Sequence, residues 1–250
     1  MDTQQEEYEQ GVFSLKDIPS HLRKYFEPKP IFDFEPIARE LYRVTKQGGV
    51  VVWVVGDATI KGSETGTSFR QALYFKEIGF NLHDTMIYEK AGSAYPETVR
   101  YYQFFEYMFV FSKGKPKTIN LIEDRENKWG GTLTFGKSSN RKADGSLKQR
   151  SEKRMVKEIG VRANMWRYSN GYGYCATDAF AHDHPAPFPE ALARDHILSW
   201  SNEGDTVLDP FAGSGTTGKM ALLHNRNFIG MEISAEYLEI ARRRVGLVTA

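Results

Sequence analysis

The sequence has 250 residues, of which 40% are hydrophobic and 26% charged, and this composition excludes a disordered polar chain. The length suits one α/β domain with an insertion, or two small domains. A lone cysteine, Cys175, excludes an intrachain disulfide and a cysteine-rich zinc site. The longest apolar run, residues 50–55, is too short to cross a bilayer, and the acidic start has no signal-peptide core. We therefore expect no membrane association and a cytoplasmic location.

The overall charge of +1 is unevenly distributed along the chain. Residues 113–170 hold fifteen Lys or Arg against six Asp or Glu, a net charge of +9, so the rest of the chain carries −8. Such a block suits contact with a phosphate backbone, although a solvated loop has the same composition. Aromatic residues in and just after this block favour a nucleic-acid surface, because rings stack on bases. These residues are Trp129, Phe135, Trp166, Tyr168, Tyr172 and Tyr174.

Helix and strand signals alternate through the first half of the chain. Apolar residues recur at helical spacing over 34–46, and a Gly-Gly pair ends this helix. The run VVVWVV, residues 50–55, has no polar alternation, which is typical of a strand covered on both faces in a parallel sheet. A second helix is expected over 68–78, and strands over 82–89 and 106–112. This alternation predicts a doubly wound α/β sheet.

The periodicity fades after residue 113. Residues 120–149 are rich in Gly, Ser, Asn and Lys, and a short basic helix is expected over 151–160. The α/β pattern resumes with FPEALARDHILSWS, a helix begun by Pro189. The expected organisation is an acidic leader (1–33), the first part of an α/β domain (34–112), a basic insertion (113–170) and the second part of the α/β domain (171–250).

The segment TVLDPFAGSGTTGKMALLHNRNFIGMEIS, residues 206–234, predicts a strand, a glycine turn, a helix and a second strand. Asp209 lies at the end of the strand 206–208, and the small residues of GSGTTG let the backbone approach a ligand closely. The helix 218–224 directs its N-terminal amides to the same place. Glu232, at the tip of the next strand, is placed to accept hydrogen bonds from two ribose hydroxyls. The pattern suits an adenosine-containing ligand and leaves both NAD-type dinucleotides and S-adenosylmethionine open.

The residues DPFAGSGTT closely resemble the cofactor motif of S-adenosylmethionine-dependent DNA amino-methyltransferases, which methylate adenine N6 or cytosine N4. GMEIS.EY...A..R resembles the strand and helix that follow this motif, and HPAPFPEALARDHILSWS, residues 184–201, resembles the segment that precedes it. ELYRVTKQGGVVVWVVGD resembles the helix and strand that come after the family's catalytic loop. The order of these motifs resembles the β permutation, in which the insertion recognises the target. The resemblance covers most of residues 34–245 and implies a Rossmann-like methyltransferase sheet, circularly permuted, with a basic insertion.

The resemblance implies roles for individual residues. The turn and its flanks would bind the cofactor through Asp209, Pro210, Phe211, Gly213, Gly215 and Thr216, with Glu232 holding the ribose. The methionine end would lie near His184, Pro185, Phe188 and Pro189. DNA contacts are expected from Lys137, Arg141, Lys142, Lys148 and Arg150. Asp57 is either a residue of the pocket lip or a polar strand end. No metal is implied.

One family feature is missing from the sequence. Members carry an Asp/Asn/Ser-Pro-Pro-aromatic loop, which holds the target amino group and stacks on the flipped base. The chain contains no Pro-Pro pair, and no strand is expected before residue 50, so the resemblance implies an incomplete sheet and leaves the catalytic residues unknown. Three explanations are open: a truncated product, a second chain or homodimer partner that supplies the loop and strands, and a module that binds DNA or cofactor without turnover.

The expected function is site-specific methyl transfer from S-adenosylmethionine to an exocyclic amino nitrogen of adenine or cytosine in double-stranded DNA. The setting would be restriction-modification or a mobile element. The rival from another class is a binding module without turnover. A methyltransferase for small molecules or proteins is a weaker rival, because such enzymes seldom need a basic, aromatic insertion of this size.

Overall fold

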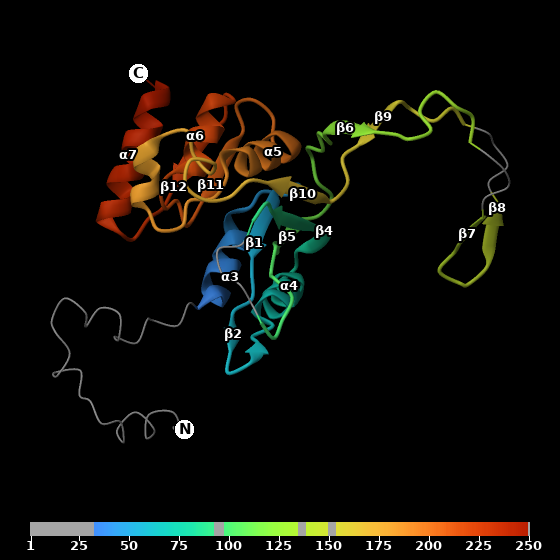
Figure 1. Ribbon diagram of the computed structural model, residues 1–250, viewed down its shortest axis with the longest axis horizontal. Helices are drawn as coiled ribbons and strands as arrows, with labels where there is room; N and C mark the ends of the chain where they lie inside the picture. The colour runs from blue at the N-terminus through green and yellow to red at the C-terminus, as the bar shows by residue number, and fades with distance from the viewer. Residues whose placement is uncertain (1–32, 93–97, 135–138, 150–153, 250) are drawn as a thin grey trace. The chain divides into compact units, whose positions relative to one another are not determined.

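The computed structural model describes residues 33–92, 98–134, 139–149 and 154–249 (Figure 1). Residues 38–250 form one compact unit. It contains a four-stranded sheet of order β1-β5-β4-β10 and a separate two-stranded sheet of β11 and β12. The expected acidic leader lies outside the described residues except for its last residue. The α/β class expected from the sequence is confirmed.

The four-stranded sheet is mixed. It consists of β1 (Val50–Val55), β5 (Phe105–Ser112), β4 (Asn81–Lys90) and β10 (Met165–Tyr168). β5 runs antiparallel to both β1 and β4, and β10 runs parallel to β4. The expectation of parallel pairing for residues 50–55 is therefore wrong for the partner that the structure describes. The expected cover on both faces is also incomplete in the described part of the chain, because within β1 Trp53 is buried, Val54 is exposed and the other four residues are half-buried. The direction of a strand depends on how the chain returns to the sheet.

One face of this sheet is covered by α4 (Thr67–Glu77). Phe75 of α4 stacks on Phe111 of β5 with ring centroids 4.6 Å apart, and lies edge-on to Trp53 of β1 at 5.1 Å. The Trp53 indole donates a hydrogen bond to Gln71 of the same helix at 2.8 Å. Aromatic packing fixes α4 on the sheet, because each ring removes a large apolar area from water.

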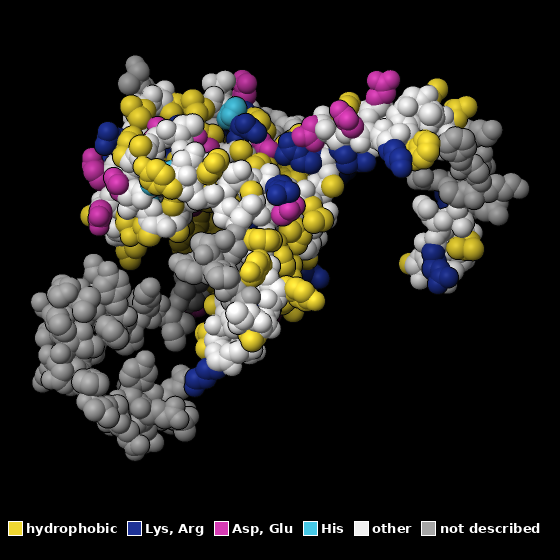
Figure 2. Space-filling model, viewed as in Figure 1, with side chains coloured by type: hydrophobic (Ala, Val, Ile, Leu, Met, Phe, Trp, Pro, Cys, Tyr) yellow, Lys and Arg dark blue, Asp and Glu magenta, His cyan; other side chains and the backbone are white. Residues whose placement is uncertain are grey.

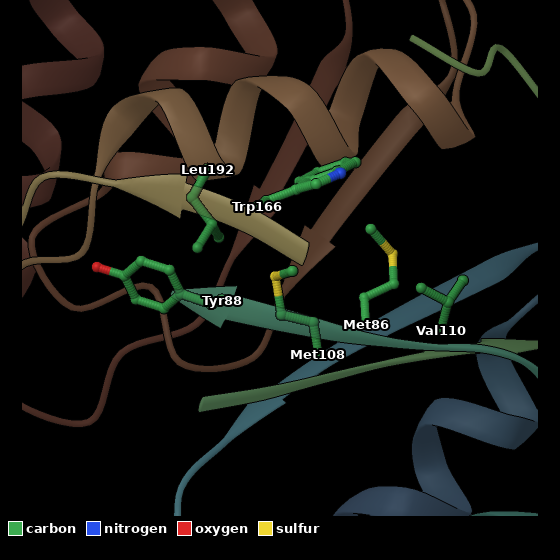
Figure 3. Packing of buried hydrophobic residues seen from close by; sticks show 6 residues of the cluster. All are labelled: Met86, Tyr88, Met108, Val110, Trp166 and Leu192. Atoms are coloured by element: carbon green, nitrogen blue, oxygen red, sulfur yellow. The ribbon is translucent and has the colours of Figure 1, made fainter. Parts of the chain in front are cut away.

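The other face is covered by α5 (Glu190–Trp200), as Figure 3 shows. Leu192 of α5 points toward the sheet, where side chains from three strands meet it. This cluster consists of Met86, Tyr88, Met108, Val110, Trp166 and Leu192. Helices therefore cover both faces of the sheet, as expected for a doubly wound arrangement.

The second sheet carries the strand-turn-helix-strand unit expected from the sequence. β11 (Thr206–Asp209) pairs in parallel with β12 (Asn227–Gly230), and α6 (Thr216–Leu223) connects them. A buried cluster of Ala193, Ile197, Met220 and Ala221 packs α5 against α6. α7 (Ala235–Thr249) follows β12. α6 begins two residues earlier than expected, at Thr216, directly after the glycine turn.

The first half contains further short elements. α3 (Phe34–Val44) precedes β1, and Tyr42 of this helix lies edge-on to Phe80 at 5.0 Å. β2 (Thr59–Ile60) and β3 (Ser63–Glu64) form an exposed hairpin before α4. A 3-10 helix, η2 (Ala179–Asp183), lies between the insertion and α5.

The basic insertion contains short antiparallel pairs. β6 (Glu123–Glu126) pairs with β9 (Ile159–Val161), and β7 (Ser139–Arg141) pairs with β8 (Leu147–Gln149). The expectation of a basic helix over 151–160 is wrong for the described residues 154–160, which are extended. Their backbone is held by strand-type hydrogen bonds, such as Val156 N to Thr132 O at 2.8 Å, in place of helical ones.

The two sheets are not joined by a backbone ladder among the described residues. There β1 pairs with β5 alone, and β11 pairs with β12 alone. Trp53 of β1 and Phe211, which follows β11, nevertheless approach with ring centroids 6.1 Å apart. Apolar side chains near these strands remain exposed, including Val54, Ile229 and Met231. The strands of the described residues therefore leave open edges. None of the described helices is long and apolar enough to span a membrane.

Candidate functional site

The glycine turn, residues 209–215, begins at the last residue of β11 and has a backbone that requires glycine at two positions. Gly213 has φ of 49° and Gly215 has φ of 79°, in the left-handed region that disfavours other residues. A Cβ at Gly215 would lie 2.9 Å from the Cα of Ala241 in α7. The Gly215 amide donates to the Ala212 carbonyl at 2.7 Å, which closes the turn. Close packing from α7 therefore fixes the backbone here.

Two predicted acids lie at this turn. Asp209 Oδ1 accepts a hydrogen bond from the Phe211 amide at 2.9 Å. Glu232 Oε2 accepts from the Gly213 amide at 2.8 Å, and its Oε1 accepts from the Ser234 amide at 2.9 Å. The structure thus brings the acid at the tip of β12 onto the glycine turn after β11, as the sequence spacing predicted.

His184 lies against the same turn. A Cβ at Gly213 would be 3.1 Å from His184 Nε2, and the imidazole lies edge-on to Tyr237 with ring centroids 4.4 Å apart. Burial lowers the pKa of His184, and the nearby Glu232 carboxylate offsets only part of this effect. The Ala186 amide donates to Nδ1 at 3.2 Å, so the proton of the neutral ring belongs on Nε2, facing the turn.

One face of α7 supports the whole site. Tyr237, Ala241 and Arg244 follow at spacings of four and three residues and therefore share a helix face. Tyr237 meets His184, Ala241 meets Gly215, and Arg244 donates to the carbonyl of Ser214. None of these three residues was predicted to have a role, although the pattern EY...A..R contains them. Their spacing was the signal that identifies them.

The remaining predicted cofactor residues differ in their placement. Thr216 is fully buried and its Oγ1 accepts a hydrogen bond from Arg244, so its side chain points into the protein. Phe188 packs against the buried clusters on both sides of α5. Phe211 is 45% exposed beside Trp53. Pro210 is half-buried within the turn. The contact of each with a ligand stays a prediction.

The predicted DNA-binding residues lie on the β7–β8 hairpin or outside the described residues. Arg141 and Lys148 are exposed on β7 and β8, and Lys142 is exposed in the turn. Figure 2 shows Lys and Arg side chains on this hairpin. Arg141 stands opposite Leu147, whereas Lys148 stands opposite Asn140, so the two cations project from opposite faces of the ribbon. Lys137 and Arg150 lie outside the described residues.

An ion network holds the root of the insertion to α5. Arg162 Nη1 donates to Asp195 Oδ2 at 2.6 Å, and its Nη2 also donates to Asp124 of β6. The Tyr168 hydroxyl donates to the same oxygen of Asp195 at 2.7 Å, and Arg194 Nε donates to Oδ1 at 2.8 Å. Burial alone would raise the pKa of Asp195, but these hydrogen bonds outweigh it and lower the pKa. Asp195 is therefore a buried, ionised anchor.

Asp57 and Cys175 have structural roles. Asp57 accepts hydrogen bonds from the Ser68 amide and from the hydroxyls of Thr65 and Thr67, so it caps the first turn of α4. Of the two alternatives for Asp57, a polar residue at a strand end fits this placement better than a residue of the pocket lip. Cys175 is buried, and burial raises the pKa of its thiol, which disfavours the reactive thiolate. No group of three or more potential metal ligands occurs in the part of the chain that the structure describes.

With this geometry established, comparison with known proteins shows the family. Residues 26–243 match the family model described as DNA methylase. The chain belongs to the DNA methylase family. It is 64% identical over 214 residues to the orphan methyltransferase M.BamHII of Bacillus amyloliquefaciens. This alignment covers 86% of this chain and 81% of the relative. The identification as a DNA amino-methyltransferase made from the sequence is confirmed.

Solved structures support the fold. The PvuII DNA methyltransferase, which is cytosine-N4-specific, matches with a TM-score of 0.62 at 20% identity and covers 86% of this chain and 73% of that one. The M1.HpyAVI-SAM complex matches with a TM-score of 0.56 at 22% identity, and the match covers 86% of this chain and 84% of that one. At these identities the likeness shows a shared Rossmann-like methyltransferase fold.

Proposed function

We propose that the chain transfers a methyl group from S-adenosylmethionine to an exocyclic amino nitrogen of adenine or cytosine in double-stranded DNA. The observation that carries the proposal is the meeting of the glycine turn, Glu232 and His184 beside the carboxyl ends of β11 and β12. Ligands of open α/β sheets bind outside the carboxyl ends of the strands. Membership of the DNA methylase family supports DNA as the substrate. A cytoplasmic location and a restriction-modification or mobile-element setting belong to this proposal.

The residues at the turn fit this cofactor. Each oxygen of the Glu232 carboxylate accepts one amide, which leaves further lone pairs for the two ribose hydroxyls. When bound, S-adenosylmethionine supplies an electrophilic methyl group on a positively charged sulfur. His184 is neutral because burial lowers its pKa, so it places no repelling charge near the sulfonium. The chain's own residues therefore bind and orient the donor, and positioning governs the transfer.

The cofactor assignment is tested by two matched Asp→Ala substitutions, one at Asp209, the last residue of β11, and one at Asp205, which immediately precedes this strand. Asp209→Ala removes the acceptor that holds the Phe211 amide and is expected to abolish S-adenosylmethionine binding in calorimetry. Asp205→Ala is the control, because Asp205 caps the Asn202 amide at the opposite end of the strand and is expected to leave the affinity unchanged. Unchanged affinity of Asp209→Ala would contradict the assignment of the turn.

The DNA part of the proposal rests on the β7–β8 hairpin. A two-stranded ribbon fits the major groove of B-DNA, and cations on both faces of this ribbon are placed to reach the phosphates on either side. Asn140 and Lys148, opposite one another, provide the side-chain chemistry that reads base edges. We infer that the insertion contacts duplex DNA through this hairpin.

We propose further that a strand from a second chain pairs between β1 and β11 and carries the Pro-Pro loop. Three observations support this partner. β1 and β11 each have one edge without a backbone partner among the described residues. Val54 on β1 is 39% exposed, which an added strand would cover. The 250 residues also contain no Pro-Pro pair to hold the target amino group.

Complementation separates a second chain, a homodimer and a binding module without turnover. The purified chain is incubated with labelled S-adenosylmethionine and mixed-sequence duplex DNA, alone and with a polypeptide comprising a β-branched strand followed by Asp-Pro-Pro-Tyr. We expect cofactor binding without transfer by the chain alone, and transfer after complementation. Transfer by a monomeric chain alone contradicts the second-chain proposal. Transfer by a chain that sediments as a dimer identifies a homodimer as the source. Cofactor and DNA binding without transfer in either mixture favours the binding module.

A further inference from the structure

Four charged side chains form a buried ion cluster beside the glycine turn. The ion cluster consists of Asp178, Glu190, Lys219 and Arg244. Asp178 Oδ2 receives Lys219 at 2.6 Å and Arg244 Nε at 3.0 Å, and Glu190 Oε1 receives Lys219 at 2.9 Å and Arg244 Nη2 at 2.6 Å. Each carboxylate thus bridges both cations, and the four formal charges cancel.

The cluster is withdrawn from water. The Arg244 side chain is fully buried, and the other three side chains are 10 to 14% exposed. Burial alone would raise the pKa of Asp178, but the hydrogen bonds from Lys219 and Arg244 outweigh it and lower the pKa. Apolar residues often replace buried ion pairs without loss of stability. Stability alone is therefore a weak explanation for an arrangement whose main property is fixed geometry.

Arg244 connects this cluster to the glycine turn. Its Nη1 donates to the Ser214 carbonyl at 3.0 Å, the Ser214 hydroxyl at 3.1 Å and the Thr216 hydroxyl at 2.8 Å. These acceptors lie on both sides of Gly215, whose φ is 79°. Because guanidinium is a rigid planar fork, its other two nitrogens, held by Asp178 and Glu190, fix the direction of Nη1.

The ion cluster joins residues from four parts of the chain. Asp178 immediately precedes η2, which leads directly to His184. Glu190 begins α5, Lys219 lies in α6, and Arg244 lies in α7. Displacement of the guanidinium would therefore release the glycine turn and the segment that carries His184 together.

We propose that Arg244 is a positioning residue for cofactor binding, which holds Ser214 and Thr216 so that the glycine turn keeps its ligand-binding conformation. The inference rests on the proposed function, since it concerns the same S-adenosylmethionine site. It adds a residue that does not touch the cofactor and acts through the turn. The other three members of the ion cluster orient its guanidinium.

The test compares two Arg→Lys substitutions on one helix. Arg244→Lys keeps the charge but loses the planar fork, whereas Arg242→Lys changes an exposed residue two positions earlier. Arg244→Lys is expected to raise the Kd for S-adenosylmethionine about 10- to 100-fold, the size of effect that small misplacements of binding groups produce. Arg242→Lys is expected to leave the Kd unchanged. Thermal unfolding of each variant is measured in parallel.

A second variant keeps the inference testable if Arg244→Lys fails to fold. Thr216→Val removes one acceptor of Nη1 at nearly constant volume and is expected to raise the Kd several-fold while unfolding remains cooperative. A lowered melting temperature with an unchanged Kd in both variants would overturn the inference, because a merely structural residue behaves in that way.

Failure of the proposed function is distinguishable from failure of the inference. A wild-type chain that binds no S-adenosylmethionine overturns the function. In that case hydrogen exchange at the amides of Gly213 and Gly215 still decides the structural step of the inference, that Arg244 holds the backbone of the glycine turn. Faster exchange in Arg244→Lys than in Arg242→Lys supports it, and equal exchange overturns it.

Discussion

The glycine turn and the β7–β8 hairpin serve the same proposed reaction but are built differently. Around the turn, Gly215 touches Ala241, Thr216 is fully buried, and Arg244 has no exposed surface. On the hairpin, every side chain described at 139–148 is exposed. A site that must fit one small molecule is enclosed by packed neighbours, whereas a surface that meets a polyanion needs accessible charge. The substitutions below test this contrast, because a packed site should be sensitive to volume and an exposed one to charge.

The largest effect is expected at Gly215. Gly215→Ala adds a left-handed backbone penalty of about 1–2 kcal/mol and a clash with the Ala241 Cα, for a total loss of about 3 kcal/mol in unfolding free energy. Gly204→Ala is the control, since Gly204 has φ of 81° with open space around its Cβ, and should cost about 1 kcal/mol. Denaturant unfolding measures both. Equal losses would show that the contact with α7 is unimportant.

The next effect is expected at the root of the insertion. Arg162→Met removes one of the cations that neutralise the buried Asp195 carboxylate and should lower the free energy of unfolding by about 2–3 kcal/mol. This loss is smaller than that expected for a fully buried ion pair, because the Arg162 side chain is 24% exposed. Arg167→Met, whose ion pair with Glu89 spans 3.6 Å at 66% exposure, should cost below about 0.5 kcal/mol. If the two variants unfold at similar urea concentrations, the ion pair between Arg162 and Asp195 does not stabilise the root of the insertion.

Charge reversal on the hairpin should change binding and leave stability intact. The double variant Arg141→Glu and Lys142→Glu is expected to lower duplex DNA affinity about 10-fold or more, and to reduce the dependence of log K on log salt by about 2. Lys76→Glu on α4 is the control for a single exposed charge outside the insertion. Titrations at several salt concentrations measure the slope. A slope equal to that of the wild type would identify the hairpin as a solvated loop.

The smallest effect concerns pH and the buried His196. Burial lowers its pKa to about 3, whereas the unfolded side chain titrates near 6.5. Because the unfolded state binds the proton first, stability should fall as the pH drops from about 6.5 to 5, by about 1 kcal/mol per pH unit. His196→Leu should flatten this dependence in urea titrations at several pH values. An unchanged slope would mean that other groups cause it.

The sequence predicted the glycine-turn half closely, and the reason lies in its packing. Asp209, Gly213 and Glu232 occupy a strand end, a left-handed position and the next strand end, so their spacing along the chain is tied to their spacing in the fold. The same constraint acts on Tyr237, Ala241 and Arg244, and their helical spacing gave a signal that was left unread. Individual contacts of these residues with a ligand stay predictions.

The first half and the insertion were less predictable. The run 50–55 indicated a buried strand, but its antiparallel partner follows only from the return path of the chain through β4 and β5. A helix was predicted over the basic stretch 151–160, but its charge composition carries no information on strand pairing. The backbone hydrogen bond between Val156 and Thr132 could therefore not be predicted. Composition identified a charged surface there, and only the fold showed which residues lie on the β7–β8 hairpin.

Helix α5 sets a limit on where this chain tolerates changes in length. It begins with Glu190 of the ion cluster and reaches Asp195 of the insertion root five residues later. At about 1.5 Å and 100° per residue, one inserted residue between them would turn one carboxylate away from its cations. The hairpin turn at Gly145 has open space around it and meets no such restriction. Lengthening of the chain should therefore accumulate at that turn, while α5 keeps a constant length.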